Sequence, residues 1–410
     1  MANDNKKHIP ALRFPEFQND GEWAYEYGNV LFDSIVNKNH NSELPILAIT
    51  QENGAVPRNM INYRVSVEDK SIEGYKVVDV GDFIISLRTF QGGIEYSRYK
   101  GICSPAYIVL RKKHDNICDD FYRYYFKTHQ YIQDLNRNLE GIRDGKMVSY
   151  KQFSEIKIPY PTFNEQRKIA DCFVSIDKEI DATTRKLEHL KEHKKGLMQK
   201  LFPVKGKTIP ELRFPEYSHR ESWNIVSFGE VTEVVNKRNK SNRTLPVYSI
   251  NNVDGFIPQS QQFDGMDSEA RGYDISAYKI IGKHTFAYNP ARINVGSIGY
   301  SGDLKDVLIS SLYVCFKTAD IIDDKFLMCF FNSHVFNQAV ECNVEGGIRN
   351  YLFYENFSRI QFAIPKLDEQ KRIASCIMSI DCEIKNINDK INLLEFHKKG
   401  LQQQLFPKFK

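Results

Sequence analysis

Three segments of the sequence contain residue types that could do catalytic or phosphate-binding chemistry. Gly206-Lys-Thr208 ends like a phosphate-binding loop, but Leu201 stands where the first glycine should lie. Without that glycine the backbone amides cannot cradle a phosphate, so we interpret the segment as a polar linker. Asp144 with Glu155-Ile-Lys157 offers the carboxylates and lysine of some nuclease sites. The matching region of the second half reads Asn356-Phe-Ser358, so that pattern favours a solvated face.

The remaining motifs also lack the residues that their chemistry needs. Tyr288-Asn-Pro-Ala291 resembles the Asn-Pro-Pro-Tyr loop of adenine methyltransferases, but the second proline and the following aromatic residue are missing. No Gly-x-Gly-x-x-Gly fingerprint precedes a helix, and the ten histidines have no ligand-like spacing. The eight cysteines include no Cys-x-x-Cys, which is typical of reduced structural thiols. The sequence therefore predicts a binding protein with no catalytic residue, metal or cofactor of its own.

Basic, amide and aromatic residues alternate at predicted strand ends and loops of two stretches, about 30–115 and 230–320. Arginine pairs with guanine and asparagine or glutamine with adenine, whereas lysine mostly neutralises phosphate. Any one of these side chains alone is more simply a solvated surface residue, so the argument depends on the whole set. The predicted DNA contacts are Lys38, Arg88, Gln91, Arg98, Lys100, Arg143, Lys146, Lys237, Arg238, Lys240, Arg243, Asn289, Arg292, Asn294, Arg349 and Asn350.

The sequence contains an internal repeat, whose second copy follows the first at an offset of 200 to 204 residues. The ends of the two halves are nearly identical, which indicates a shared scaffold and a shared docking partner. The middles diverge, which indicates that each half performs a variant of the same function. A repeat of this length is a duplicated domain with its connector, because solenoid units are much shorter. The matching segments are Ile9–Phe17 with Ile209–Tyr217, Trp23 with Trp223, Glu165–Ala170 with Glu369–Ala374, His193–Leu197 with His397–Leu401, and Leu201–Pro203 with Leu405–Pro407.

Each half has the same predicted order of elements. A strand-rich stretch is followed by an amphipathic helix, about 119–138 and 323–342, which Asp-Asp opens as cap and dipole partner. A glycine-bearing loop then carries Arg143 or Arg349. This best-matched arginine pair either contacts the DNA backbone in both halves or forms a salt bridge that shapes the loop. A short strand ending in proline leads into a long helix.

Apolar residues in the two long helices recur alternately every four and three residues, which is the period of a coiled coil. Each helix spans about 37 residues and therefore about 55 Å. Lys194 and Lys398 interrupt the seams at matching positions, which costs stability but can fix register. We favour seam-to-seam pairing over packing of each helix on its own domain; the period leaves the relative direction open. The seam residues are Ile169, Phe173, Ile176, Ile180, Leu187, Leu190 and Leu197, then Ile373, Ile377, Ile380, Ile384, Ile387, Ile391, Leu394 and Leu401.

Length and composition limit the class of protein. The 410 residues are enough for two or three domains, and 41% hydrophobic with 26% charged residues is ordinary globular composition. A net charge of +4 is too weak to identify a nucleic-acid partner by itself. The polar N-terminus has no signal-peptide core, and no run of 18 apolar residues occurs. We expect a cytoplasmic bacterial protein with no membrane partner.

The duplicated plan resembles the specificity subunits of type I restriction–modification systems. The residues that carry the resemblance are the Pro-x-x-x-Glu-Gln helix starts at Pro161 and Pro365, and the Ile-Asp pairs at Ile176 and Ile380. The resemblance implies an α/β (α+β) fold with two target-recognition domains, separated by two long helices in an antiparallel coiled coil with pseudo-twofold symmetry. The domains expected on this basis are 1–160 and 204–364 for recognition, with 161–203 and 365–410 as helical spacers.

The same resemblance implies a function and partners. Each recognition domain would read one half of a split, asymmetric target in double-stranded DNA, and the helices would set the gap. Two modification subunits with S-adenosylmethionine would methylate adenine, restriction subunits would use ATP and Mg, and the chain itself would be no enzyme. The repeated segments 165–203 and 369–407 would be the docking surfaces for the modification subunits. The alternatives are the specificity chain of a related restriction system and a coiled-coil adaptor with two protein-binding domains.

Overall fold

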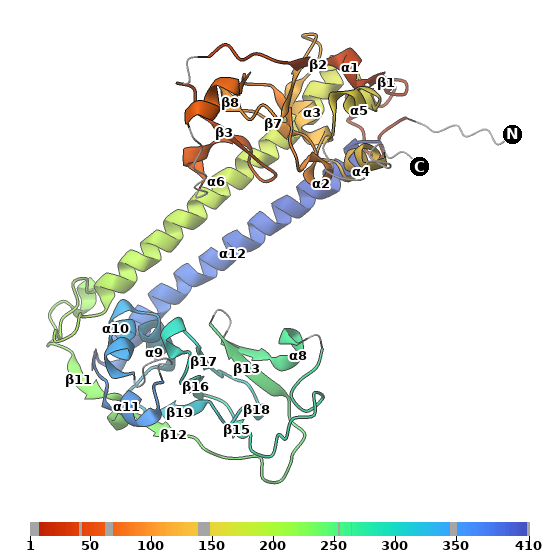
Figure 1. The fold of residues 1–410 in the computed structure, drawn as a ribbon. Helices are drawn as coiled ribbons and strands as arrows, with labels where there is room; N and C mark the ends of the chain where they lie inside the picture. Colours follow the sequence, from red (N-terminus) through yellow and green to blue (C-terminus); the bar gives the residue numbers. More distant parts are fainter. Residues whose placement is uncertain are drawn as a thin grey trace. The chain divides into compact units, whose positions relative to one another are not determined.

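The computed structural model describes residues 8–40, 43–61, 69–137, 148–252, 255–263, 265–344 and 351–407. The chain divides into two compact units (Figure 1): Met1–Thr184 with Asp389–Lys410, and Arg185–Asn388. Two helices of 39 residues each, α6 (Phe163–Leu201) and α12 (Leu367–Leu405), belong partly to one unit and partly to the other. Each unit therefore contains one end of both long helices, and its boundary differs from the boundary of the sequence repeat.

The first unit is built on a four-stranded antiparallel sheet in the order β2-β9-β6-β7, with three two-stranded antiparallel pieces, β1-β10, β3-β4 and β5-β8. The strands are β1 (Ala24–Tyr27), β2 (Phe32–Ile35), β3 (Leu47–Thr50), β4 (Gly54–Pro57), β5 (Lys76–Val78), β6 (Phe83–Ile85), β7 (Glu95–Tyr96), β8 (Gly101–Cys103), β9 (Ile108–Lys112) and β10 (Lys157–Tyr160). The short helices are α1 (Gly28–Leu31), α2 (Thr89–Gly92), α3 (Asp119–Tyr125), α4 (His129–Arg137) and α5 (Tyr150–Ser154).

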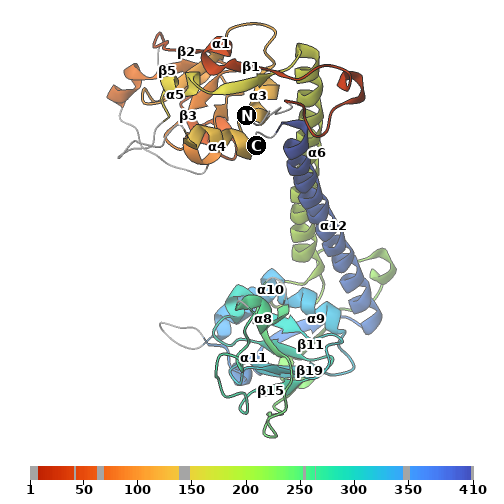
Figure 2. The same cartoon turned by 90° about the vertical axis from the view of Figure 1, so that its right-hand side faces the viewer.

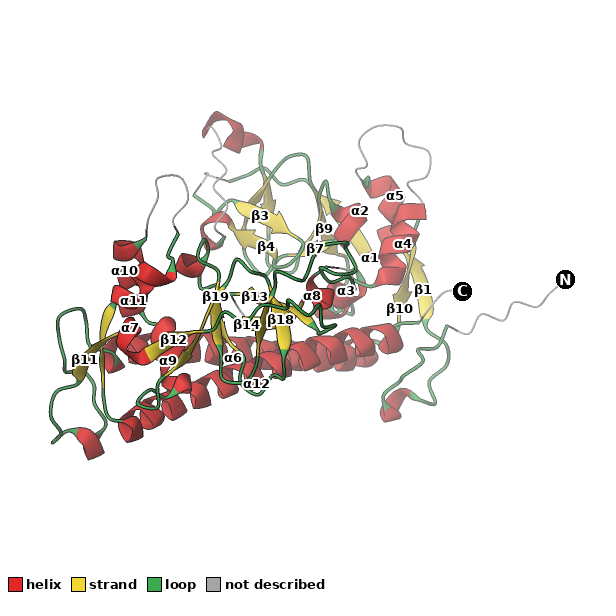
Figure 3. Cartoon of the chain, turned by 90° about the horizontal axis from the view of Figure 1, so that it is seen from below, coloured by secondary structure: helices red, strands yellow, loops and turns green. Residues whose placement is uncertain are grey.

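The second unit repeats this plan, although its sequence matches the first only loosely in the middle. Its antiparallel sheet has the order β12-β19-β16-β17, and a second sheet has the order β14-β13-β18-β15 with β13 and β18 parallel. In the first unit the equivalent pieces β3-β4 and β5-β8 are joined by one parallel bridge, Ile46 to Ile102. Figure 3 colours these elements by type.

The bounds in the second unit are as follows. The strands are β11 (Asn224–Ser227), β12 (Thr232–Val234), β13 (Val247–Asn251), β14 (Gly255–Pro258), β15 (Lys279–Ile281), β16 (Phe286–Tyr288), β17 (Ile298–Tyr300), β18 (Val307–Ile309), β19 (Val314–Thr318) and β20 (Gln361–Ile364), which pairs with β11. The helices are α7 (Phe228–Val231), α8 (Gln259–Gln262), α9 (Asp324–Phe331), α10 (His334–Asn343), α11 (Tyr354–Arg359) and the 3-10 turn η5 (Ile293–Val295).

The amphipathic helix that the sequence predicts after each strand-rich stretch is in fact two helices, so the prediction of one continuous helix is wrong. Hydroxyl side chains start the second helix of each pair. Ser333 Oγ accepts the backbone N–H of Phe336 at 3.2 Å. Thr128 Oγ1 accepts the N–H of Tyr131 at 3.3 Å and donates to the carbonyl of Tyr125. These local bonds satisfy amides at a new helix start, which lets the chain bend without leaving them unpaired.

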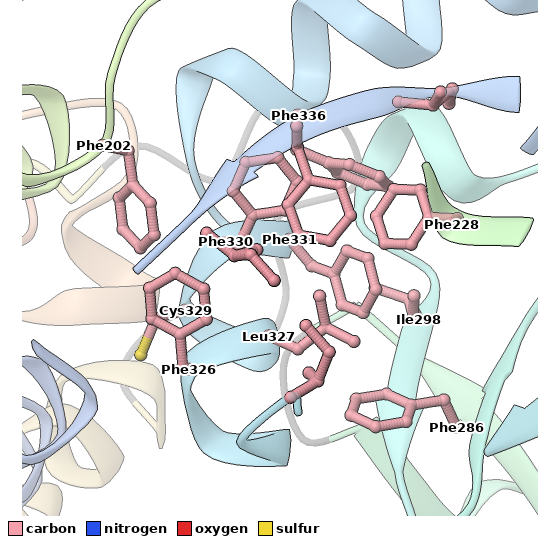
Figure 4. Packing of buried hydrophobic residues seen from close by; sticks show 14 of the residues in the cluster. Phe202, Phe228, Phe286, Ile298, Phe326, Leu327, Cys329, Phe330, Phe331 and Phe336 are labelled. Carbon is pink, nitrogen blue, oxygen red and sulfur yellow. The ribbon is translucent and has the colours of Figure 1, made fainter. Parts of the chain in front are cut away.

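Aromatic rings fill the core of each unit, and each core also includes a phenylalanine that follows the C-terminal end of one long helix. Phe406, just past α12, lies 6.5 Å from the ring of Trp23 and 5.4 Å from that of Phe121 in the first unit. Figure 2 shows this C-terminal end of α12 beside the first unit. Phe202, just past α6, lies 5.5 Å from Phe326 in the second unit (Figure 4). The repeated Leu-Phe-Pro phrase therefore closes the core of the domain built by the other half of the sequence.

Two other repeated phrases hold the start of each long helix. The guanidinium of Arg13 forms a bidentate pair with Glu165 at 2.7 and 2.8 Å, and that of Arg213 pairs with Glu369 at 2.8 Å on both arms. The next residue in each helix is a buried glutamine. Gln166 accepts the backbone N–H of Cys118 and donates to the carbonyl of Pro161, as Gln370 does with its own unit's backbone. The Glu-Gln pair thus joins helix, N-terminal arm and sheet domain, and is unavailable to an external partner.

Candidate nucleic-acid interface

Ion pairs between the long helices show that α6 and α12 run antiparallel in each unit. In the first unit, Glu179 pairs with Lys390 at 2.5 Å and Asp177 with Lys398 at 2.5 Å. In the second, Lys186 pairs with Glu383 at 2.8 Å and Lys194 with Asp381 at 2.5 Å. Partner numbers rise on one helix as they fall on the other, so the direction that the heptad period left open is settled. The prediction of paired seams is confirmed.

The predicted seam residues near the start of each long helix pack in the core of a unit: Ile169 and Phe173 in the first, and Ile373 and Ile377 in the second. Leu187, Ile387, Ile169 and Phe173 are buried, as are Ile373 and Ile377. The other predicted seam residues are half-buried: Ile176, Ile180, Leu190, Leu197, Ile380, Ile384, Ile391, Leu394 and Leu401. Their neighbours on the outer faces are mostly exposed. These apolar side chains therefore form the less exposed stripe of each long helix.

Asp177 is the centre of a polar cluster in the first unit. Its carboxylate accepts Lys398 Nζ, the Tyr124 hydroxyl at 2.6 Å and the guanidinium of Arg123 at 2.8 Å. Burial by itself would raise the pKa of Asp177, but these hydrogen bonds and the two positive charges outweigh burial and hold that pKa below its ordinary value. The lysine that interrupts the seam is thus neutralised within the helix pair.

Five of the predicted DNA contacts lie on one recurring piece of structure, a single helical turn that follows the third strand of each main sheet. Arg88 precedes α2 and Gln91 lies within it; Arg292 precedes η5, which contains Asn294. All four side chains are exposed. The fifth, Asn289, has a structural role, because its side-chain oxygen accepts the N–H of Ala291 and shapes the turn.

A hairpin tip lies against this turn in both units, and it carries polar residues that the sequence reasoning did not select. Between β3 and β4 the tip bears Gln51, Glu52 and Asn53, all exposed. The Gln51 side chain packs on α2, so closely that a Cβ at Gly92 would lie 2.7 Å from it. Between β13 and β14 the tip bears Asn252, which lies beside the end of η5. The Asn53-Gly54 dipeptide, a strong hairpin signal, could have located this tip from sequence.

The other predicted contacts come from different loops. Lys38 follows β2, and Lys237, Arg238 and Lys240 follow β12; all are exposed. Lys240 lies next to the buried Asn239 in the chain. The side-chain amide of Asn239 accepts the backbone N–H of Arg243 at 2.9 Å and donates to the carbonyl of Arg243 at 3.0 Å. Two further basic residues have acidic neighbours: Lys100 lies 3.1 Å from Asp79, and Arg243 lies 3.3 Å from Asp306.

Arg98 lines a cleft of about 840 Å³ in the first unit, together with the hairpin tip and the end of α12. Both signs of charge line it, including Arg123, Lys127, Glu95 and Asp177. Lys127 pairs with the buried Glu95 at 2.5 Å. Burial raises the pKa of Glu95 despite that lysine. The cleft therefore carries less free positive charge than its basic residues alone suggest.

Four predicted contacts, Arg143, Lys146, Arg349 and Asn350, lie outside the described residues. Within the described ranges, no group of three or more His, Cys, Asp or Glu side chains is arranged to hold a metal ion. In the same part of the chain, no helix is long and apolar enough to cross a membrane. All eight cysteines are free thiols.

Comparison with known proteins places this fold in a family. Residues 26–192 and 220–395 match the type I restriction modification DNA specificity domain, once in each half. The chain is 25% identical over 363 residues to the type I restriction enzyme MjaVIII specificity subunit of Methanocaldococcus jannaschii, covering 83% of this chain and 78% of that protein. A putative MjaX specificity subunit of the same organism is 22% identical, covering 78% and 76%.

A solved structure has the same fold. The S subunit of a type I restriction–modification system from M. genitalium superposes with a TM-score of 0.56 at 15% identity, covering 98% of this chain and all of that one. Two matched specificity domains and a pair of long helices account for nearly the whole chain. The C-terminal end of each long helix packs in the core of a unit, α6 in the second and α12 in the first. The chain belongs to the family of type I restriction–modification DNA specificity subunits.

Proposed function

We propose that this chain reads a split DNA target, with one recognition domain on each half-site and the helix pair setting the unread gap. The observation that supports this most is the exposed single turn with its hairpin tip. It occurs once in each unit, with the same arginine but different amide side chains. A shared frame with different reading groups suits two different half-sites. In this proposal residues 1–160 and 204–364 recognise DNA, and 161–203 and 365–410 are spacers.

We further propose that the chain is not catalytic and delivers DNA to partners. Two modification subunits would bind S-adenosylmethionine and methylate adenine, and restriction subunits would use ATP and Mg. A net charge of only +4 supports this division of labour, because neutralisation of phosphate dominates DNA affinity and partners would supply much of it.

The modification subunits would dock on outward residues that both helices share. Glu165, Gln166 and the Leu-Phe-Pro phrases are identical in the two halves but buried. The matched residues that remain exposed include His193 and Lys195 on α6 and His397 and Lys399 on α12. Two copies of one exposed surface fit two copies of one partner.

Selection from random duplexes tests the proposed function. The chain, purified with its modification subunit, is incubated with a pool of random double-stranded DNA, and the bound fraction is sequenced. We expect two short motifs at a fixed separation. A bound fraction with no sequence preference would contradict the proposal and favour the alternative of a protein-binding adaptor.

A further inference from the structure

The single turn and the hairpin tip beside it occupy the same place in both units, although the middle sequences align poorly; the turn is α-helical in the first unit and a 3-10 turn in the second. Arg88 and Arg292, 204 residues apart, share an unusual backbone conformation, with φ −110° and ψ 8° for the first and φ −136° and ψ 11° for the second. A left-handed glycine follows each turn, Gly93 at φ 79° and Gly296 at φ 84°. Each turn thus begins after an arginine and ends at a glycine with positive φ, although only the arginine is repeated among its outward side chains.

Neighbouring backbone and side chains contact the described residues that flank the hairpin tips. Gly54 and Gly255 close the tips at φ +71° and φ +68°. A Cβ at Gly54 would lie 2.6 Å from the carbonyl oxygen of Tyr96, so β4 and β7 approach as closely as backbones can. At the other tip the Ser297 hydroxyl donates to the carbonyl of Ile250 at 3.4 Å. Gln51 and Asn252 therefore both lie next to backbone that has close neighbours, which suits recognition groups.

The two arginines are free to bind an external anion. Among the described residues neither guanidinium has an ion-pair partner, whereas Lys100 and Arg243 each have a carboxylate within 3.3 Å. Each arginine instead acts on a half-buried tyrosine. Burial raises the pKa of Tyr107, and the charges of Arg58 and Arg88 oppose that rise. Burial likewise raises the pKa of Tyr313, and the charge of Arg292 opposes that rise. Exposed guanidinium groups with no carboxylate partner are suited to phosphate.

The amides around each arginine differ between the units. The first unit presents Gln51, Asn53 and Gln91, with the carboxylate of Glu52 between the two tip amides. The second presents Asn252 and Asn294. Glutamine and asparagine suit adenine N6 and N7, and a glutamate accepts from cytosine N4. The amide side chains, which can identify bases, thus differ between the two units, whereas the arginine, which can hold phosphate, is the same in both.

We propose that the single turn and its neighbouring hairpin tip form the base-reading edge of each recognition domain. Gln51, Gln91, Asn252 and Asn294 are the specificity-determining residues, and Arg88 and Arg292 hold the DNA backbone alongside them. This assignment rests on the proposed function, because it requires that the two units read separate half-sites.

Duplex selection with matched variants tests the assignment. The chain with its modification subunit is used throughout, and the probe is the random-duplex pool. Gln51→Ala and Gln91→Ala should each relax one or two positions of one half-site by roughly 5- to 150-fold and leave the other half-site unchanged. Asn252→Ala and Asn294→Ala should do the same to the other half-site. Arg88→Ala and Arg292→Ala should weaken binding on all sequences and reduce the slope of log affinity against log salt by about 1.

Two controls separate loss of recognition from damage to the fold or loss of charge. Gln18→Ala removes an exposed amide from the N-terminal arm, and Arg359→Ala removes an arginine, 67% exposed, that pairs with Glu355 on α11. Both should leave the selected motif and the salt slope unchanged. If the unmodified chain selects no motif, the proposed function fails. If it selects a split motif that the four amide variants leave intact, or arginine variants keep the full salt slope, the assignment of this edge fails while the function stands.

Discussion

Lys398 Nζ lies 2.5 Å from the carboxylate of Asp177, and the same contact recurs 204 residues away between Lys194 and Asp381. Each lysine occupies a seam position that a coiled coil normally fills with an apolar side chain. Each aspartate comes from the opposite helix. A shift of one helix by a heptad would leave the lysine and aspartate without each other, so the pair fixes the antiparallel register. The Ile-Asp phrase of the repeat is therefore part of the helix pair itself.

The two ion pairs should contribute unequally to stability. The Asp177 side chain is 17% exposed and also holds Arg123 and Tyr124, whereas that of Asp381 is 47% exposed. Asp177→Asn should therefore destabilise the local helix pair by about 1–3 kcal/mol, and Asp381→Asn by less than about 1 kcal/mol. Hydrogen exchange of the amides in each helix segment measures the two losses separately. Equal losses would contradict the difference in burial.

The Asp177 pair should also make the first unit sensitive to acid. The pKa of Asp177 in the folded chain is lowered, so the stabilisation is fully present above the unfolded pKa of about 3.9 and is lost as pH falls through the lower folded value. The difference in melting temperature between the unmodified chain and Asp177→Asn should accordingly shrink as pH falls from about 6 towards 2. A difference that stays constant over that range would show that the carboxylate charge contributes nothing.

Truncation of Phe406 should damage the first unit, although this residue belongs to the second half of the sequence. Its ring packs among those of Trp23, Phe121 and Phe173. The ring centres of Phe406 and Phe173 are 6.1 Å apart. Loss of a buried phenylalanine side chain costs about 3–5 kcal/mol. In a Trp223→Phe background, Trp23 fluorescence should report earlier urea unfolding for Phe406→Ala. Phe396→Ala, also on α12 but 76% exposed, is the control and should change the midpoint little.

The sequence was most informative where one periodic rule decides the structure. The step of four and three residues predicted a stripe that is buried or half-buried along both helices, because helices that pair on one face cover a stripe of that period. It could not say which charge meets Lys194, since Asp381 lies 187 residues away and pairing depends on direction. Nor could it show that Phe202 completes the core of the second unit, because an apolar residue after a helix looks the same wherever it packs.

The recognition middles were predicted less well, for a different reason. The break at Thr128 depends on a side-chain hydrogen bond that competes with helix continuation, and propensity does not resolve that competition. Basic residues were selected by type, so the predicted set includes Arg88 and Arg292 but not the amides at Gln51 and Asn252. Those amides matter only because the hairpin brings them onto the single turn, which is a tertiary relationship.

The exposed matched residues on the helices should decide how many modification subunits bind. Lys195→Glu and Lys399→Glu each reverse the charge of one proposed docking surface without touching the seam. Each single variant should retain one modification subunit, and the double variant should retain none, as measured by the mass of the purified complex. Lys205→Glu, an exposed lysine in the linker after α6, is the control and should keep both. A double variant that still binds two subunits would place the docking surface elsewhere.

Shortening both long helices should change the gap between the half-sites without changing the half-sites. Removal of residues 180–186 and 384–390 deletes one heptad from each helix, centred on Thr183 and Ile387. The remaining seam then keeps its period, and the Asp177–Lys398 and Lys194–Asp381 pairs can still form. Seven residues correspond to about 10 Å of helix, so duplex selection should recover both original motifs at a shorter separation. As a control, removal of the heptad from α6 alone mismatches the two seams and should abolish the fixed separation. If the double deletion changes the half-site sequences themselves, or leaves the gap as it was, the helices do not set the spacing.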